Sequence, residues 1–124
     1  MKVLLVDDSK TMRKILKKNL EGYAFEYFEA ENGQIALGYL VDHDFDLVIT
    51  DVNMPEMDGY SMCHHIRSMD RNKNVKIMVL STETPGLEIM QKLLISDFVI
   101  KPPPPGEVEA KIEKILGIQT LIAK

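Results

Sequence analysis

Short apolar runs alternate along this chain with segments in which apolar residues recur every three or four positions. Most of the runs are rich in valine, leucine and isoleucine, which is typical of buried strands. The other segments carry polar residues on one face and apolar residues on the opposite face, which indicates amphipathic helices. The predicted strands cover residues 3–6, 26–29, 47–50, 77–80 and 98–100, and the predicted helices cover residues 12–20, 35–40, 60–69, 87–94 and 108–116.

Strict alternation of strands and helices predicts an α/β fold, in which helices cover both faces of a parallel five-stranded sheet. The runs 47–50 and 77–80 are almost wholly apolar, as strands covered on both faces should be, whereas 26–29 is weaker and is expected near an edge. No repeat or interdomain linker interrupts the pattern. We therefore expect a single domain over residues 1–117, with Gly117 ending the last helix and 118–124 forming a C-terminal tail or the start of a linker.

Composition argues against several classes of protein. The 124 residues are 45% hydrophobic and 27% charged, an ordinary balance for a globular domain. The formal net charge of −4 leaves no basic excess to neutralise nucleic-acid phosphates. No apolar run approaches the roughly 20 residues of a membrane span, and a lone Cys63 allows no intramolecular disulfide. We expect a cytoplasmic domain without a signal peptide, membrane insertion or a nucleic-acid partner.

Residues with polar or charged side chains stand directly after four of the predicted strands. Asp7 and Asp8 follow the first strand, and Asp51 follows the third; Ser81 follows the fourth and Lys101 the fifth. Ligands of open α/β sheets bind beyond the carboxyl ends of the strands, where the strand order reverses. If the first and third strands are neighbours, three carboxylates converge at that point.

Three carboxylates in one cleft repel one another, by about 4 kcal/mol for two charges about 4 Å apart at an effective dielectric constant near 20. A divalent cation relieves this repulsion, and an all-oxygen ligand set suits Mg²⁺. Lys101 adds a mobile positive charge that suits an anion, and Ser81 adds a hydroxyl that can donate to one. These residue types together favour phosphoryl transfer onto an aspartate, with the carboxylate as nucleophile.

The segments Val6–Ser9, Asp51–Gly59, Ser81 and Lys101–Pro102 resemble those of the CheY-like receiver domains of two-component response regulators. The likeness covers residues 2 to 117, and the Asp51–Gly59 stretch is its most specific part. It implies a single doubly wound, flavodoxin-like (βα)5 domain with strand order 2-1-3-4-5. It also implies a phosphorylation-dependent signalling switch, in which a sensor histidine kinase or a phosphotransfer protein donates a phosphoryl group to Asp51.

The resemblance assigns roles around the acceptor. Asp8 and Asp51 would ligate Mg²⁺ directly, together with the backbone carbonyl of Asn53, while Asp7 would act mainly through water. Mn²⁺ can substitute for Mg²⁺. Lys101 would pair with the phosphoryl oxygens, and the peptide that joins it to Pro102 is expected to be cis.

Other roles that the resemblance implies concern signalling and the lifetime of the phosphoryl group. Ser81 is the switch hydroxyl, and Phe98 is the aromatic residue that changes rotamer as Ser81 moves. Asn53 and Glu83 tune hydrolysis, and their identities predict a short-lived aspartyl phosphate. Thr82 is bulkier than the alanine or glycine usual at this position and is expected to narrow access to the site.

The region on either side of Phe98 departs from the family pattern. Residues 84–97 look slightly short, and Leu94–Asp97 replaces the usual Gly-Ala pair, so the preceding helix is expected to be shorter or shifted. Four prolines at 102–105 should form a stiff loop, with Pro105 able to enter the first turn of the last helix. All these departures fall on the face that CheY-like proteins use to bind downstream targets, which is made by residues 87–94, 98–100 and 108–116.

Other functions stay open. A phosphohydrolase of the haloacid-dehalogenase type would need an acid two residues after its nucleophile, where this chain has Asn53. The chain could also be a receiver cut from a longer regulator with a separate output domain, or a receiver-like interaction module that is never phosphorylated. We expect no turnover of another substrate, a monomer that can dimerise when phosphorylated, and chemotaxis as one pathway among several.

A few residues outside this set allow two interpretations. His43, His64 and His65 lack the ligand spacing of a zinc site, and Cys63 is more typical of a small buried residue than of a reactive thiol. The basic face of the helix at 12–20 is either solvated or a docking surface for the phosphotransfer domain of a kinase. Its residues are Arg13, Lys14, Lys17 and Lys18.

Overall fold

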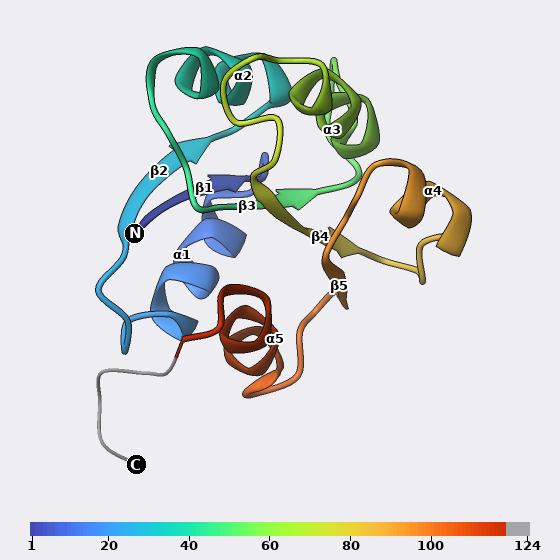
Figure 1. Cartoon of the computed structure of the whole chain (residues 1–124). Coiled ribbons are helices and arrows are strands. Elements are labelled where there is room, and N and C mark those ends of the chain that lie inside the picture. The colour runs from blue at the N-terminus through green and yellow to red at the C-terminus, as the bar shows by residue number, and fades with distance from the viewer. Residues whose placement is uncertain (119–124) are drawn as a thin grey trace.

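The computed structural model describes residues 1–118, so only Ile118 of the predicted tail is included. Five strands and five helices alternate in this part of the chain (Figure 1). None of these helices is long and apolar enough to cross a membrane. The elements are β1 (Lys2–Val6), α1 (Lys10–Asn19), β2 (Glu26–Ala30), α2 (Gly33–Asp42), β3 (Leu47–Asp51), α3 (Gly59–Arg67), β4 (Lys76–Ser81), α4 (Leu87–Lys92), β5 (Asp97–Ile100) and α5 (Glu107–Leu116).

The strands form one parallel sheet in the order β2-β1-β3-β4-β5, which confirms the predicted fold. The weak strand β2 lies at an edge and pairs only with β1, as expected. The order reverses between β1 and β3, where Val6 is in register with Thr50. The carboxyl ends of β1 and β3 therefore lie side by side at the switch point of the sheet.

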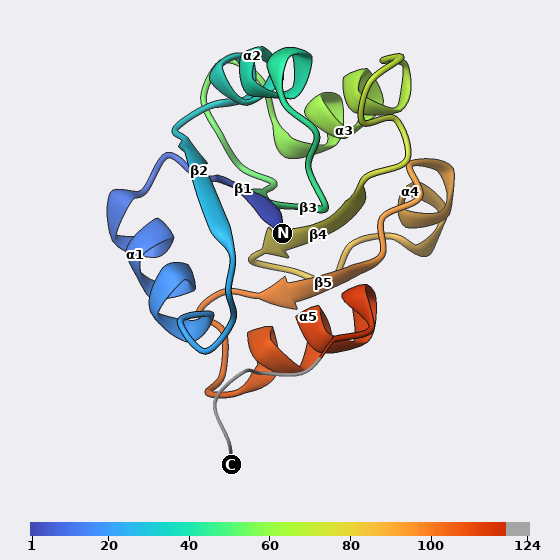
Figure 2. The same ribbon diagram turned by 60° about the vertical axis from the view of Figure 1, so that its left-hand side comes forward.

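Helices cover both faces of the sheet, and each central strand contributes to two separate cores. The helices α1 and α5 lie on one face, and α2, α3 and α4 lie on the other (Figure 1, Figure 2). Within β1, Leu4 and Val6 pack in the core beneath α2–α4, whereas Val3 and Leu5 pack in the core beneath α1 and α5. Because successive side chains of a strand point to opposite faces, a strand between two cores must be apolar throughout.

Three of the helices begin at side-chain caps. The side chains of Ser9, Asn32 and Asp58 each accept a hydrogen bond from the backbone N–H three residues further on, and so cap α1, α2 and α3. Each cap satisfies a backbone donor that the helix itself leaves unpaired. At the opposite end of the chain, Gly117 has φ 65° and ends α5, as predicted. The loops at the carboxyl edge of the sheet therefore enter α1, α2 and α3 in fixed conformations.

The segment around α4 differs from the predicted boundaries. The helix ends at Lys92, earlier than the predicted 94, in line with the departure of this segment from the family pattern. Leu93 caps the helix, and Leu94 has φ 54°, in the left-handed region that residues other than glycine seldom occupy. Leu94 is also 64% exposed. The chain thus turns sharply from α4 into β5 without the small residues that usually make such a turn.

The proline-rich segment after β5 forms a loop that stays outside α5. The Lys101–Pro102 peptide is cis, as predicted. The helix begins only at Glu107, and its N-cap residue Gly106 has φ 82°. The suggested place of Pro105 in the first helical turn is therefore wrong, because a left-handed glycine separates the proline from the helix.

Arg67 ties the end of α3 to the turn after α4. Its guanidinium donates to the backbone oxygens of Leu93 and Leu94, at 2.8 and 2.9 Å. It also donates to those of Lys73 and Val75, each at 2.8 Å. Burial of this side chain lowers the pKa of the guanidinium without neutralising it, since arginine stays charged in proteins. One side chain thus bonds backbone oxygens both in the turn after α4 and in the segment before β4.

Gly59 allows the loop after β3 to fold back over the end of that strand. Its N–H donates to the backbone oxygen of Val52 at 2.8 Å. A Cβ atom at this position would lie 2.2 Å from the backbone oxygen of Asp51 and 3.0 Å from the Cα of Val52. Because both of these are backbone atoms, only glycine fits this close approach.

Replacing Arg67 by methionine should lower the free energy of unfolding by about 2–4 kcal/mol, because several carbonyl oxygens lose a charged donor. Arg67→Lys should lower it by less, since an ammonium group reaches fewer of these oxygens than a planar guanidinium. Urea denaturation measures both values. The control is Arg71→Met, which removes an exposed pair with Asp44 and one exposed hydrogen bond, 3.3 Å long, to the backbone oxygen of Val41, and should have a much smaller effect. Equal losses for the Arg67→Met and Arg71→Met variants would contradict the structure.

Replacing Gly59 by alanine should lower the free energy of unfolding by about 1–3 kcal/mol, because the added methyl group overlaps backbone atoms. Gly38→Ala provides a matched control within α2, where a Cβ atom meets nothing within 4 Å. That change should raise the free energy of unfolding by about 0.5–1 kcal/mol. The same denaturation measurement checks both, and stabilisation by both substitutions would disprove the close approach at Gly59.

Candidate functional site

Three carboxylates meet at the switch point of the sheet. Asp7 and Asp8 directly follow β1, and Asp51 is the last residue of β3. One carboxylate oxygen from each residue lies within 4.8 Å of the others. Asp7 and Asp51 are buried, whereas Asp8 is exposed. The structure thus brings together the three acidic residues that the sequence placed at strand ends.

Lys101 lies against two of these carboxylates. Its Nζ is 3.1 Å from Asp7 Oδ2 and 3.0 Å from Asp51 Oδ1. Burial disfavours the charged ammonium, but the contacts with Asp51 and Asp7 outweigh it and raise the pKa of Lys101. The lysine therefore stays charged at neutral pH and offsets part of the repulsion within the acidic cluster.

Neighbouring residues bond both the side-chain carboxylate and the backbone oxygen of Asp7. Burial raises the pKa of its carboxyl group, although the Ser9 N–H, 2.9 Å from Oδ1, and the Lys101 ammonium both oppose this. The backbone oxygen of Asp7 accepts a hydrogen bond from Arg13 Nη1 at 2.6 Å. Arg13 Nε in turn lies 3.0 Å from Glu29 Oε1 on β2. The acidic turn is therefore fixed by α1 and by the edge strand.

The two oxygens of Asp51 have different surroundings. Oδ1 accepts a hydrogen bond from the Asn53 N–H at 3.2 Å and contacts Lys101. Among the described residues, no hydrogen bond or ion pair engages Oδ2. One oxygen thus orients the carboxylate while the other stays available for reaction. The side chain of Asn53 itself is exposed.

Ser81 ends β4 next to this cluster, but its hydroxyl is engaged locally. It donates to the backbone oxygen of Glu83 at 2.5 Å and accepts from the Glu83 N–H at 3.2 Å. Ser81 is buried, whereas Thr82 and Glu83 are exposed. The predicted switch hydroxyl therefore closes a tight turn here and makes no hydrogen bond to Asp51.

Phe98, the predicted switch aromatic, lies on the edge strand β5 and is partly buried. Its ring packs against the core beneath α2–α4. The residue is in register with Val79 of β4, two positions before Ser81. Phe98 is therefore near the end of β4 but outside the acidic cluster.

The acidic cluster fits a hard divalent cation. Its donors are carboxylate oxygens, which Mg²⁺ and Mn²⁺ prefer, and the exposed Asp8 leaves a side open to solvent. In the part of the chain that the structure describes, no other group of three or more histidine, cysteine, aspartate or glutamate side chains is placed to hold a metal. Cys63 is buried, and burial raises the pKa of its thiol to about 12, as expected for an unreactive thiol.

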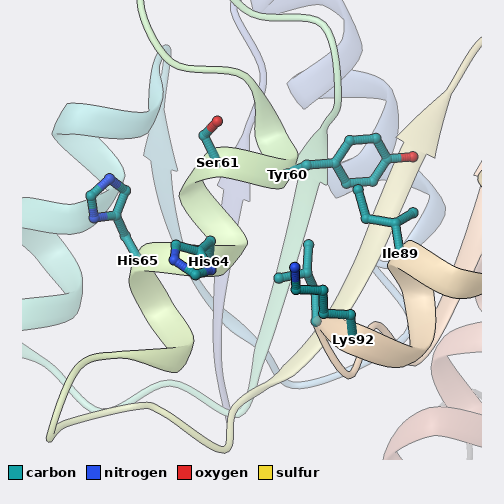
Figure 3. Close-up of a pocket in the computed structure, with 7 residues that line it drawn as sticks. Tyr60, Ser61, His64, His65, Ile89 and Lys92 are labelled. Carbon is teal, nitrogen blue, oxygen red and sulfur yellow. The ribbon is translucent and has the colours of Figure 1, made fainter.

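A hollow of about 340 Å³ lies between α3 and α4, and none of the three clustered aspartates lines it. Tyr60 and His64 reach from α3 toward Ile89 and Lys92 of α4 (Figure 3). His65 also lines the hollow, with its ring directed away from α4. Two imidazoles, a phenol and an ammonium do not form a set of metal ligands. Among the described residues, the acidic cluster at the carboxyl edge of the sheet is therefore the candidate metal site, and this hollow is not.

Two residues that shape the site were not singled out from the sequence. Gly59 lets the loop pass over Asp51, and Arg13 holds the turn of Asp7. The glycine stood within the recognised Asp51–Gly59 stretch, but its close contact has no sequence signal. Arg13 and Lys17, whose Nζ is 2.9 Å from Glu29 Oε2, were interpreted only as members of a basic face. Part of that face is therefore paired with the edge strand β2.

Comparison with known proteins identifies the family. Residues 3–113 match the response regulator receiver domain. The chain is 38% identical over 121 residues to the chemotaxis protein CheY1 of Helicobacter pylori, covering 94% of this chain and 98% of that protein. It is 39% identical over 125 residues to the probable transcriptional regulator ycf27 of Cyanidium caldarium, covering 98% of this chain. The chain spans only about half, 49%, of the length of that relative.

A solved structure agrees with this identification. The response regulator protein TrrA of Thermotoga maritima, in complex with Mg²⁺-BeF, superposes with a TM-score of 0.80 at 30% sequence identity. The match covers 93% of this chain and 98% of that one. Strand order, acidic cluster and sequence likeness all lead to one assignment. The chain belongs to the family of response regulator receiver domains of two-component systems, and it is CheY-like.

Proposed function

We propose that Asp51 accepts a phosphoryl group from a sensor histidine kinase or a phosphotransfer protein, and that the domain acts as a phosphorylation-controlled switch in the cytoplasm. The observation that carries this proposal is the asymmetric surrounding of the Asp51 carboxylate. Lys101 and the Asn53 N–H hold one oxygen, and the other has no partner among the described residues. Such an arrangement orients a nucleophile without blocking it.

In the proposed reaction, Asp51 Oδ2 forms a bond to phosphorus while the bond between phosphorus and the histidine nitrogen of the donor breaks. The histidine leaves with the electron pair of that bond and takes up a proton. Lys101, already beside Asp51, neutralises negative charge on the phosphoryl oxygens. Mg²⁺, held by Asp8, Asp51 and the backbone carbonyl of Asn53, with Asp7 mainly through water, would supply further charge neutralisation; Mn²⁺ can substitute.

Signalling then depends on Ser81 exchanging partners. Its hydroxyl must leave the backbone oxygen of Glu83 in order to donate to a phosphoryl oxygen on Asp51. The β4–α4 loop follows this movement, and Phe98 changes rotamer with it. A downstream target would bind the face formed by α4, β5 and α5, where Leu87 and Leu94 are 70% and 64% exposed. We propose a monomer that can dimerise when phosphorylated.

The relatives suggest two settings for such a switch. CheY1 is a chemotaxis protein that this chain covers almost completely, which favours a chemotaxis role as a stand-alone receiver. The likeness to ycf27, of which the chain spans 49%, favours instead a receiver joined to an output domain of a transcriptional regulator. In either setting, we infer that the domain acts on its own Asp51 and does not turn over another substrate. Asn53 offers no acid for a phosphohydrolase reaction.

Acetyl phosphate with Mg²⁺ should add one phosphoryl group to the protein, and Asp51→Asn should abolish the addition because the nucleophilic carboxylate is lost. Mass spectrometry of the intact protein measures the product. Removal of the metal with EDTA should suppress the reaction at least about tenfold, since charge on the phosphoryl group is then less well neutralised. Asp58→Asn, at an exposed cap of α3, is the matched control and should still be modified.

Three outcomes would refute this assignment. Equal modification of the wild-type and Asp51→Asn proteins would place the phosphoryl group elsewhere. Absence of any modification would favour an interaction module that is never phosphorylated. Sustained release of phosphate from many phosphomonoesters would favour a phosphohydrolase.

Thr82→Ala should speed dephosphorylation of the modified domain, because a smaller exposed side chain beside Ser81 leaves more room for the attacking water. We expect a rate increase of about two- to tenfold, which corresponds to about 0.4–1.4 kcal/mol in the barrier. Phosphate release after removal of acetyl phosphate measures the rate. Thr84→Ala, in the same loop, serves as the control. An unchanged rate in the Thr82→Ala variant would refute the role of this residue in access.

A further inference from the structure

Lys111 of α5 holds both the backbone and the ring of Phe98. Its Nζ donates to the backbone oxygen of Phe98 and lies over the aromatic ring, 4.8 Å from the ring centroid. The same ammonium is 3.4 Å from Asp97 Oδ1 and 3.2 Å from Glu107 Oε1. One cation therefore joins the edge strand β5 to α5 through the predicted switch residue.

Phe98 lies on an edge strand, and Lys111 contacts it from the helix on the other face of the sheet. Its ring packs against the core beneath α2–α4, whereas Lys111 belongs to α5 on the opposite face. Since β5 is an edge strand, the lysine reaches around the edge to the ring. A ring on an edge strand is less enclosed than one on a central strand, so a single side chain can decide its position.

The two carboxylates keep the ammonium over the ring. Asp97 precedes Phe98 on β5, and Glu107 lies one turn before Lys111 on α5. The side chains of Lys111, Asp97 and Glu107 are 25%, 26% and 31% exposed, so solvent screens these pairs only in part. A cation fixed in this way attracts the negative face of the ring, and the attraction is lost when the ring turns away.

We propose that Lys111 is a positioning residue that holds Phe98 in its resting rotamer and thereby sets how readily phosphorylation of Asp51 moves the switch. The inference rests on the proposed function, in which Phe98 moves together with Ser81. A ligand that selects the active state must overcome every contact that exists only in the resting state. Removing the cation should therefore favour the active state without any change near Asp51.

The test uses beryllofluoride with Mg²⁺ as a probe for the phosphoryl site, titrated into ¹⁵N-labelled protein and followed by NMR signals of residues 81–83. Lys111→Met keeps the length of the side chain and removes its charge. We expect beryllofluoride to bind this variant about two- to fivefold more tightly, the fold-change that loss of an exposed cation–π contact predicts. Lys111→Arg should restore the wild-type affinity, because a guanidinium also stacks on aromatic rings.

Lys114→Met is the matched control. It removes the same charge from the same helix, and the described part of the structure shows no hydrogen bond or ion pair for this lysine. Its affinity for beryllofluoride should equal that of the wild type. Equal tightening by Lys111→Met and Lys114→Met would overturn the proposal, because a general charge effect would then explain both.

A double-mutant cycle separates contact with the ring from a merely structural role. In a Phe98→Ala background, Lys111→Met should no longer change the affinity, since no ring remains for the lysine to hold. Persistence of the full effect in that background would overturn the proposal. The proposed function fails in a distinguishable way, because wild-type protein would then show no response to beryllofluoride at all.

Discussion

The structure depends on the cost of placing three carboxylates together at the ends of two adjacent parallel strands. Asp7 and Asp51 are buried, where like charges repel strongly and are poorly screened. The Lys101 ammonium offsets part of this repulsion, because it contacts the carboxylates of both Asp7 and Asp51. Asp7 follows β1, Asp51 ends β3 and Lys101 follows β5, and the strand order β2-β1-β3-β4-β5 places these three residues at one edge of the sheet. The fold and the chemistry of the site are therefore linked by one electrostatic requirement.

Sequence was most informative about the strands that are buried on both faces. Each residue of a central strand enters one of the two cores, as Leu4 and Leu5 do, so an unbroken apolar run marks such a strand clearly. The acidic cluster was equally accessible, because polar residues after parallel strands must meet at one edge of the sheet. Periodicity placed the acidic residues at strand ends, and the strand order that makes β1 and β3 neighbours came from the resemblance to CheY-like receiver domains.

Sequence was least informative where one side chain meets distant backbone. Arg67 donates to backbone oxygens up to 27 positions away along the chain. The residues next to Arg67 in the sequence give no indication of these hydrogen bonds. The sequence also does not show that a methyl group at position 59 would overlap the backbone of Asp51, because this depends on how the loop folds back over β3. Leu94 has a positive φ, although residues other than glycine favour negative φ, and predictions from sequence assume that preference. Its carbonyl is satisfied by Arg67, so the tertiary contact compensates the local conflict.

The two ends of α4 differ in how many hydrogen bonds hold them. Its C-terminal end is fixed, since Arg67 bonds the oxygens of Leu93 and Leu94. Its N-terminal end begins at Gly86 without a side-chain cap, and the adjacent Leu87 is 70% exposed. The helix has only six residues, too few to be stable by itself. In the switch proposed above, a change in the Ser81 turn would reach α4 at its uncapped end and not at the end that Arg67 holds.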